Sequence, residues 1–322
     1  MRKYDLQEAA HSFTPTNRQR YNSANEFFKR VFRQKVYKLS FDAGFTCPNR
    51  DGTLGKRGCI FCGEGGSGDF AEKITPETIE QAMDKAKQRI CSKTRAEKFI
   101  AYFQSYTNTY AKAAELERLF MPVISRDDIC ALSIATRPDC IENSVYELIA
   151  QLCKIKPVFI ELGLQTVCQK SIEFIRRGYE TEIFDFAVKK LKAAGANVIA
   201  HVILGLPEED KNQMLKTVKH VAKAKADGIK LQLLHVLKGT DLAEVYSKGF
   251  FEALSLEQYT DILCESINIL PPEIVIHRLT GDAPKKLLIE PQWSANKKAV
   301  LNEITKAFNE RNVIQGSKLN QQ

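Results

Sequence analysis

The stretch Pro157-Val-Phe-Ile-Glu-Leu-Gly163, a helical pattern over 184–194 and the run Asn197-Val-Ile-Ala-His-Val-Ile-Leu204 together decide the fold class. Both apolar runs have the length of a strand and are rich in β-branched residues, and the segment between them is long enough for a helix. This order predicts a β-α-β unit with parallel strands that are buried on both faces.

The same alternation continues in both directions along the chain. Further strands are expected over 36–41, 98–103, 129–135 and 228–235, and further helices over 75–91, 111–120, 142–153 and 214–226. Six β-α units argue for a parallel sheet with outer helices. Six units are too few to close an eight-fold barrel, so we expect an α/β fold in the form of an open, partial (β/α)6 TIM-like barrel.

The chain is expected to divide into a basic N-terminal extension, a barrel core and a C-terminal extension packed on the core, over 1–30, 31–236 and 237–322. Residues 1–22 are polar and are expected to be loose at the start, whereas 23–33 have the pattern of a short helix with Phe27, Phe28, Val31 and Phe32 on one side. In the C-terminal part, helices are expected over 254–270 and 294–310, with a short strand at 273–277.

The composition is ordinary for a globular protein, with 44% apolar and 27% charged residues among 322. No run approaches the ~18 apolar residues of a membrane span, and the first 22 residues lack the apolar core of a signal peptide. We therefore expect a cytoplasmic protein, with no membrane partner, whose thiols stay reduced.

The net charge of +8 is concentrated at the two ends of the chain. Residues 1–38 carry nine Lys or Arg against three acidic residues, and residues 285–322 carry seven against three. Basic arms on a near-neutral centre suit a polyanionic partner such as a nucleic acid. Basic termini that serve only solubility are the alternative.

Three of the nine cysteines, Cys47, Cys59 and Cys62, lie on a glycine-rich loop directly after the first expected strand. Thiolates bind soft metals, so the cluster predicts a metal site. A structural zinc site needs four ligands, and the sequence offers no nearby fourth cysteine or histidine. Three cysteines suit an iron–sulfur cluster with one iron left open. Zinc and a redox dithiol stay as alternatives.

The loop ends in a C-x-aromatic-C pattern, with Phe61 as the aromatic residue, and so resembles the radical S-adenosylmethionine (SAM) superfamily. The eleven-residue gap between Cys47 and Cys59 resembles the branch that includes the catalytic subunit of Elongator. The runs 42–53, 101–107, 136–140, 161–166 and 228–231 resemble the YhcC/YtqA subgroup, and the resemblance extends from about residue 30 to the end of the chain.

This resemblance implies a [4Fe–4S] cluster held by Cys47, Cys59 and Cys62, with SAM bound to the open iron. It implies that reduction cleaves SAM into methionine and a 5′-deoxyadenosyl radical, which takes a hydrogen atom from the substrate. A one-electron donor of the flavodoxin or ferredoxin type would supply the electron.

The resemblance also places the contacts to SAM at the carboxyl ends of the strands, where β/α barrels gather their functional groups. They are expected from Phe61, Gln104, Arg137, Gln165, Arg177, Gly205 and Pro207. Gln104 stands where the superfamily usually has Gly-Gly-Glu for the amino group of SAM. Arg137 is expected at the carboxylate of SAM, or else in a structural pair with Asp139.

The other expected contacts follow the later strands. Gln165 is expected near the ribose, and Arg177 at SAM or a phosphate unless it is an ordinary charge at a helix end. Gly205 and Pro207 are expected to support the adenine through backbone contacts.

His201, Lys230 and His235 are the candidates for the group that faces the substrate, with interior packing as the alternative for each. By resemblance the substrate is the wobble uridine of tRNA, in the aminomethyl-uridine pathway, and the basic arms agree with an RNA partner. Two alternatives stay open: the same chemistry on a small metabolite or peptide, and a zinc-stabilised RNA-binding protein without catalysis.

Overall fold

The computed structural model describes residues 4–63, 65, 71–92 and 94–319, and a parallel sheet lies at its centre. The six central strands are β1 (Tyr37–Asp42), β3 (Phe99–Phe103), β4 (Ile129–Thr136), β5 (Val158–Gln165), β6 (Asn197–Leu204) and β7 (Gly228–Leu233). Two short strands, β2 (Glu72–Lys73) and β9 (Val275–Arg278), extend the sheet parallel to β1 and β7. Because β2 and β9 lie at opposite ends of the strand order, the barrel is open, which confirms the expected fold class.

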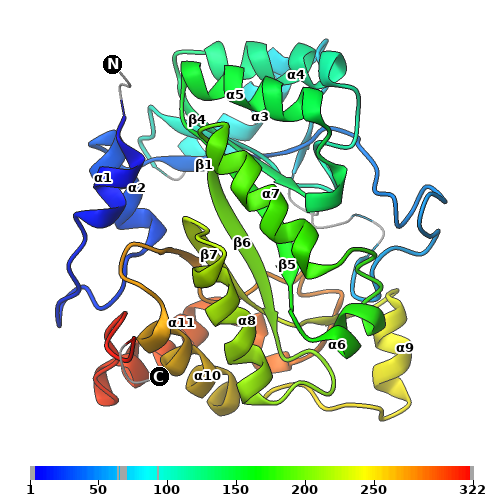
Figure 1. Ribbon diagram of the computed structural model, residues 1–322, viewed down its shortest axis with the longest axis vertical. Coiled ribbons are helices and arrows are strands. Elements are labelled where there is room, and N and C mark those ends of the chain that lie inside the picture. The colour runs from blue at the N-terminus through cyan, green and yellow to red at the C-terminus, as the bar shows by residue number, and fades with distance from the viewer. Residues whose placement is uncertain (1–3, 64, 66–70, 93, 320–322) are drawn as a thin grey trace.

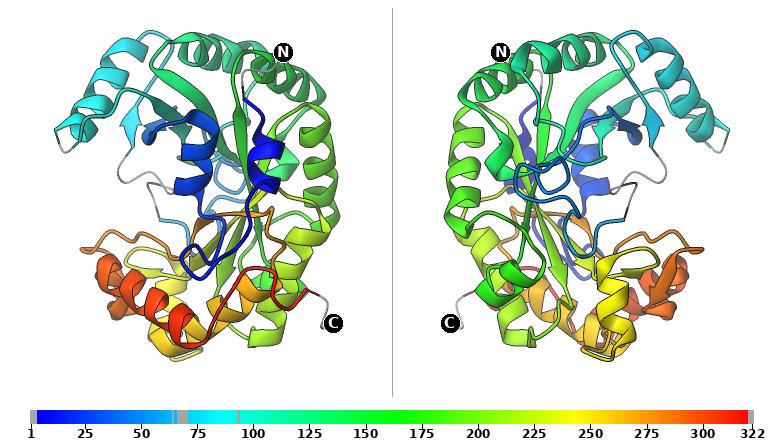
Figure 2. Two further views of the ribbon diagram at one scale, coloured as in Figure 1. Left: turned by 90° about the vertical axis from the view of Figure 1, so that its left-hand side faces the viewer. Right: turned by 90° about the vertical axis from the view of Figure 1, so that its right-hand side faces the viewer.

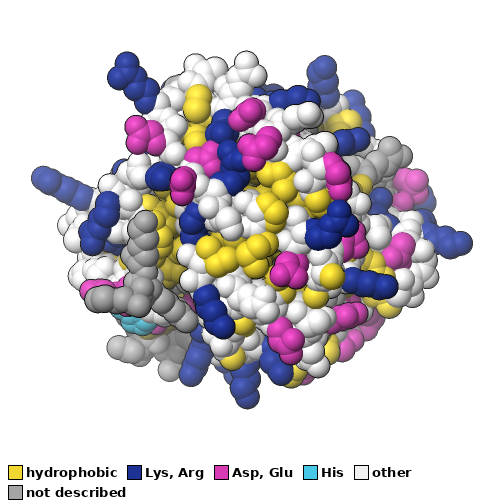
Figure 3. Space-filling model, turned by 90° about the horizontal axis from the view of Figure 1, so that it is seen from above, with side chains coloured by type: hydrophobic (Ala, Val, Ile, Leu, Met, Phe, Trp, Pro, Cys, Tyr) yellow, Lys and Arg dark blue, Asp and Glu magenta, His cyan; other side chains and the backbone are white. Residues whose placement is uncertain are grey.

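Helices cover the outer face of this sheet (Figure 1). They are α3 (Ile79–Cys91), α4 (Ala113–Ser125), α5 (Asn143–Ile155), α7 (Thr181–Ala193), α8 (Lys211–Lys223) and α10 (Leu256–Ile269). In β5, the outward side chains Val158, Ile160 and Leu162 are buried in the core shared with these helices. Figure 3 shows one outer face, where Lys and Arg are interspersed with Asp and Glu.

The inward side chains of β5 alternate with those residues and form layers inside the barrel. Phe159, near the amino end, belongs to an apolar cluster, whereas Glu161 in the middle and Gln165 at the carboxyl end line a cavity. The barrel interior therefore changes from apolar to polar toward the carboxyl ends of its strands.

Helix α2 (Ala24–Phe32) closes the amino end of the barrel (Figure 2). Its four large apolar residues, Phe27, Phe28, Val31 and Phe32, are buried, and the centroids of the Phe28 and Phe159 rings lie 5.5 Å apart. The looseness expected at the start of the chain does not extend to 6–11, which form helix α1 (Leu6–His11); residues 1–3 lie outside the described residues. Asp5 caps α1, and Ala10 packs in the same cluster as α2.

The structure also contains short elements that the strand and helix patterns did not predict. Short helices α6 (Gln169–Phe174) and α9 (Asp241–Ser247) flank the carboxyl end of the barrel, and β8 (Val236–Leu237) pairs with β10 (Leu288–Glu290) in an antiparallel ribbon. The expected helix near the C-terminus is α11 (Lys297–Glu310), which follows a 3-10 turn at Gln292–Ala295. A second 3-10 turn, Pro138–Cys140, follows β4. The three-part division of the chain stays a prediction.

None of the helices in the described part of the chain is both long and apolar enough to span a lipid bilayer.

Candidate functional site

The three cysteine thiols lie on the loop that follows β1, and they line one cavity of about 920 Å³. Cys47, Cys59 and Cys62 are unpaired and half-buried. The pKa of the Cys59 thiol is raised to about 11, mainly by burial and to a smaller extent by the charge of the neighbouring Cys62. A metal ion displaces the proton of such a thiol, because the thiolate is the ligand form. The donor set therefore suits a metal centre.

The spacing of the thiols bears on the type of metal centre. Within the ranges that the structure describes, no three His, Cys, Asp or Glu side chains converge to hold one metal ion. A structural zinc site requires four ligands around a single ion. In a cubane cluster each thiolate binds a different iron, so three separated thiols around one cavity are compatible with a cluster.

Two residues between the first and second cysteines shape the loop, and the sequence patterns did not single them out. Asn49 donates from Nδ2 to the Sγ of Cys59 at 3.4 Å and to the Arg176 carbonyl at 2.7 Å. Arg50 donates from Nη2 to the carbonyl of Cys62 at 2.8 Å. Gly58 has a φ of +76°, and a Cβ there would lie 2.9 Å from the Arg50 guanidinium, so the close packing requires glycine.

Arg137 is held by Asp139 at the carboxyl end of β4. Its Nε and Nη2 donate to the two carboxylate oxygens at 3.0 and 2.7 Å, which is the structural pair that the sequence left open. The third nitrogen, Nη1, lies 4.0 Å from the Sγ of Cys47 and points toward the cavity. A two-pronged clamp on a ligand carboxylate is therefore not available from this conformation, although one N–H group faces the site.

Arg177 is a buried structural residue. Nε donates to the Tyr179 carbonyl at 2.9 Å, and Nη1 donates to the carbonyls of Leu164 and Thr166, each at 2.7 Å. The guanidinium also stacks over the Tyr179 ring, 4.6 Å from its centroid. These bonds fix the chain after β5, so Arg177 contributes to the cavity wall chiefly by holding the backbone in place.

Of the remaining expected contacts, three line the cavity and two do not. Phe61, Gln104 and Gln165 are lining residues. The Oε1 of Gln165 is buried and has no hydrogen-bond partner among the described residues, which leaves an acceptor for a ligand. Gly205 and Pro207 do not line the cavity; Gly205, with a φ of +92°, donates its N–H to the Met214 sulfur.

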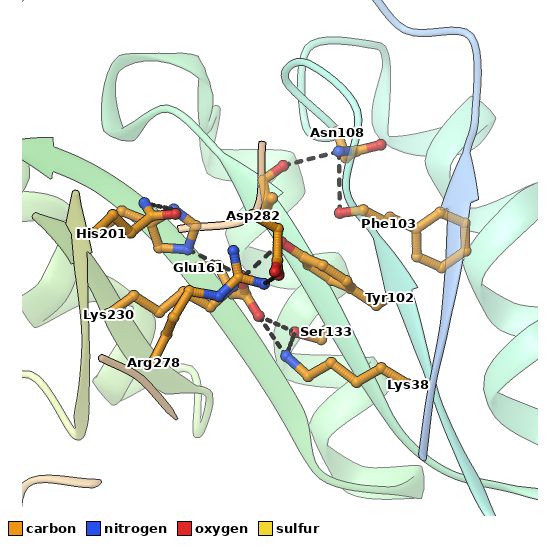
Figure 4. Close-up of polar contacts among 12 residues, drawn as sticks. Lys38, Tyr102, Phe103, Asn108, Ser133, Glu161, His201, Lys230, Arg278 and Asp282 are labelled. Carbon is orange, nitrogen blue, oxygen red and sulfur yellow. Dashed lines mark hydrogen bonds and ion pairs between the residues drawn. The ribbon is translucent and has the colours of Figure 1, made fainter. Parts of the chain in front are cut away.

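A buried carboxylate lies at the floor of the cavity (Figure 4). One oxygen of Glu161 accepts from the Nζ of Lys38 and the hydroxyl of Ser133, both at 2.7 Å. The other accepts from the Nζ of Lys230 and lies 2.9 Å from the Nε2 of His201. One carboxylate thus holds His201 and Lys230, two of the three candidates for the group that faces the substrate. The sequence alone did not indicate these partners of Glu161.

Charges in this network shift several pKa values. Burial raises the pKa of Glu161, but the charges of Lys230 and Lys38 outweigh it and keep the carboxyl well below its usual range. Burial lowers the pKa of Lys230, with only partial compensation from Glu161. Burial and the charge of Lys230 lower the pKa of His201 to about 4. At neutral pH the floor therefore combines the Glu161 carboxylate, the Lys230 amine with its lowered pKa and a neutral His201 imidazole.

His235, the third candidate, lines the same cavity without joining this network. Burial lowers its pKa to about 4, and its Nε2 has no hydrogen-bond partner within the described ranges. The imidazole lies against Gly281, where an added Cβ would come within 2.5 Å of Cε1. His235 is therefore a neutral group with one open nitrogen at the cavity wall.

The buried histidines predict a loss of stability in acid. Between pH 6.5 and 4 the unfolded chain binds a proton at each of His201 and His235 that the folded chain does not bind, so stability falls as the pH falls. Going from pH 7 to 5 should cost about 2 kcal/mol for each histidine.

Urea denaturation at both pH values tests this expectation. The variant His235→Gln should lose about 2 kcal/mol less than the wild type over that range, whereas His11→Gln, at an exposed position, should match the wild type. Equal losses in all three proteins would show that the folded chain protonates His235 as readily as the unfolded chain does.

Known proteins resemble this chain over most of its length. The sequence model described as the radical SAM superfamily matches residues 52–221, and a model described as the radical SAM C-terminal domain matches residues 226–310. YtqA of Bacillus subtilis is 43% identical over 297 residues, which are 92% of each chain.

Two more distant proteins resemble a smaller part of the chain. The tRNA uridine(34) acetyltransferase of Methanocaldococcus jannaschii is 29% identical over 188 residues, 57% of this chain and 33% of that protein. The structure of the archaeal Methanocaldococcus infernus Elp3 with its N-terminus deleted has a TM-score of 0.62 at 18% identity, covering 76% of this chain and 63% of that one. The second likeness is one of fold.

Proposed function

Because this chain belongs to the radical SAM superfamily, in its YhcC/YtqA subgroup, we propose that Cys47, Cys59 and Cys62 hold a [4Fe–4S] cluster and that the substrate is the wobble uridine of tRNA. The enzymes of this superfamily use the cluster together with SAM. When bound, the two supply a 5′-deoxyadenosyl radical that can take a hydrogen atom from a substrate.

The single observation that carries the proposal is that all three thiols line the cavity at the carboxyl ends of the strands. Asn49 supports it, since an N–H group aimed at the Sγ of Cys59 stabilises a thiolate at that position. The unpartnered Oε1 of Gln165 supports SAM in the same cavity, because a ribose hydroxyl is a suitable donor to it.

Residues of the chain would position the reactants and exclude water. Arg137, fixed by Asp139, would offer one N–H to a carboxylate beside Cys47. Gln104 lines the cavity directly after β3, and its side-chain oxygen would accept a hydrogen bond from an amino group. His201 and Lys230, held by Glu161, would bind the substrate at the floor, where the enclosing barrel keeps water away from a reactive species.

A sequence relative supports tRNA as the substrate. A relative with 29% identity over 57% of this chain is named for an activity on uridine 34 of tRNA. A cytoplasmic location and a flavodoxin- or ferredoxin-type electron donor belong to the same proposal. The alternative substrate, a small metabolite or peptide, would use the same cavity.

Nucleoside analysis tests the substrate. Total tRNA from cells with and without this protein is digested to nucleosides and compared by mass spectrometry. A change confined to a wobble-uridine derivative is expected, and it should return with the wild type but not with Cys59→Ala/Cys62→Ala. Identical nucleoside profiles would contradict tRNA as the substrate and would favour a metabolite or peptide.

A further inference from the structure

The basic N-terminal segment and the cysteine cavity lie at opposite ends of the barrel. Helix α2 packs under the amino end of the barrel, whereas the cysteine loop lies at the carboxyl end (Figure 2). None of the described residues within 1–38 lines the cysteine cavity, so this arm does not form its wall.

Several cations of that segment are also bound by the protein itself. Arg20 donates to Asn309 at 2.8 Å, and Arg30 donates to the Ala9 carbonyl at 3.2 Å. Lys38 points into the barrel and pairs with Glu161. Part of the positive charge counted along residues 1–38 is therefore bonded within the protein and is not available to a partner.

A second group of cations lies at the mouth of the cavity, and we call Lys238, Lys285 and Lys286 the lysine rim. Lys285 and Lys286 are exposed and line the same cavity as the three cysteines. Lys238 is exposed and lies beside them, because its backbone N–H donates to the Leu287 carbonyl at 2.8 Å next to the β8–β10 ribbon.

The three ammonium groups of the lysine rim are not paired with carboxylates in the described part of the chain. None of the ion pairs formed within the described part of the chain involves its three lysines. Asp282, a carboxylate of the same segment, already pairs with Arg278 and Lys297. Three adjacent ammonium groups without a carboxylate partner favour an anionic ligand.

The cavity also limits the form of such a ligand. It extends from Lys285 and Lys286 at the surface to Glu161 and Lys230 inside the barrel. A base inside a duplex cannot reach an interior site, so enzymes that react with a base act on an unpaired or extruded nucleotide. The flanking phosphates of that nucleotide stay outside, at the rim.

We propose that the lysine rim binds the phosphates on either side of an unpaired nucleotide of a folded RNA, whose base enters the cavity. This inference rests on the proposed function, since it assigns the surface that holds the tRNA. The proposed phosphate contacts of the RNA lie at the cavity mouth and not on the N-terminal arm.

Binding of the anaerobically prepared full-length protein to bulk tRNA, measured over a range of salt concentrations, tests the rim. The variant Lys238→Gln/Lys285→Gln/Lys286→Gln should bind at least about tenfold more weakly at 0.15 M salt, and the slope of log affinity against log salt should fall by about 2. The matched control Arg18→Gln/Arg33→Gln/Lys35→Gln removes three exposed cations from the N-terminal segment and should change affinity less than about twofold.

The outcomes separate the rim from the proposed function. Equal weakening in both triple variants, or a larger effect in the N-terminal one, would overturn the rim while leaving tRNA as the substrate. Wild-type protein that cleaves SAM but shows no salt-dependent binding of tRNA would overturn the tRNA proposal, and the rim with it.

Discussion

Replacing Glu161 by Gln is expected to lower the free energy of unfolding by about 3–5 kcal/mol. The side chain is buried and pairs with Lys230 and Lys38. The variant therefore leaves Lys38 without its counter-ion, and the buried Lys230, whose pKa burial already lowers, must give up its proton or stay charged without a partner. The volume of the side chain barely changes, which makes charge the cause of the loss. Urea denaturation at pH 7, with the slope m checked for constancy, measures it.

Two further variants make this prediction specific. Glu303→Gln removes a carboxylate from an exposed pair with Lys306, 3.6 Å away, and should change stability by less than about 0.5 kcal/mol. Glu161→Gln/Lys230→Met also removes the buried amine that has lost its partner, and it should recover part of the loss. A loss below about 1 kcal/mol in Glu161→Gln would mean that the carboxylate does not anchor the floor.

The double variant Cys59→Ala/Cys62→Ala should form no 5′-deoxyadenosine from SAM above background under reducing, anaerobic conditions. Removing two of three thiols leaves too few ligands for a cluster. The matched control is Cys91→Ala, at an exposed position at the end of α3, which should keep wild-type yield. The product is measured by chromatography, and cleavage of SAM by the double variant would place the cluster elsewhere.

The order of strands and helices could be predicted from the sequence because strands buried on both faces are long apolar runs. Val158, Ile160 and Leu162 illustrate this, since their outward packing requires nothing beyond apolar character. Short elements with few apolar residues escaped prediction. Helix α1 depends on its Asp5 cap and on contact with α2, and neither leaves a periodic pattern long enough to recognise.

The cavity was predicted less evenly than the fold. Cysteine spacing identified the loop, but Asn49 and Arg50 act through bonds across the folded loop, which the spacing does not record. Glu161 is surrounded by apolar residues in the sequence, and its partners come from other strands of the barrel. Parallel pairing brings these distant residues together, so only the register of the sheet reveals the network.

Charge counts along the chain do not show where the charges lie in the fold. Residues 1–38 are as basic as the sequence suggests, yet Lys38 points into the barrel and Arg30 bonds the backbone. Lys238 and Lys285 lie far apart in the sequence and meet only through the β8–β10 ribbon. Counting charges does not show which face of a fold they occupy.

The iron and acid-labile sulfide content of anaerobically purified wild-type protein, with its visible absorbance, tests the central claim most directly. Brown protein with about four irons and four sulfides per chain, lost in Cys59→Ala/Cys62→Ala, is the predicted result. Colourless protein that carries one zinc per chain would contradict the account, because it would leave an RNA-binding protein without radical chemistry.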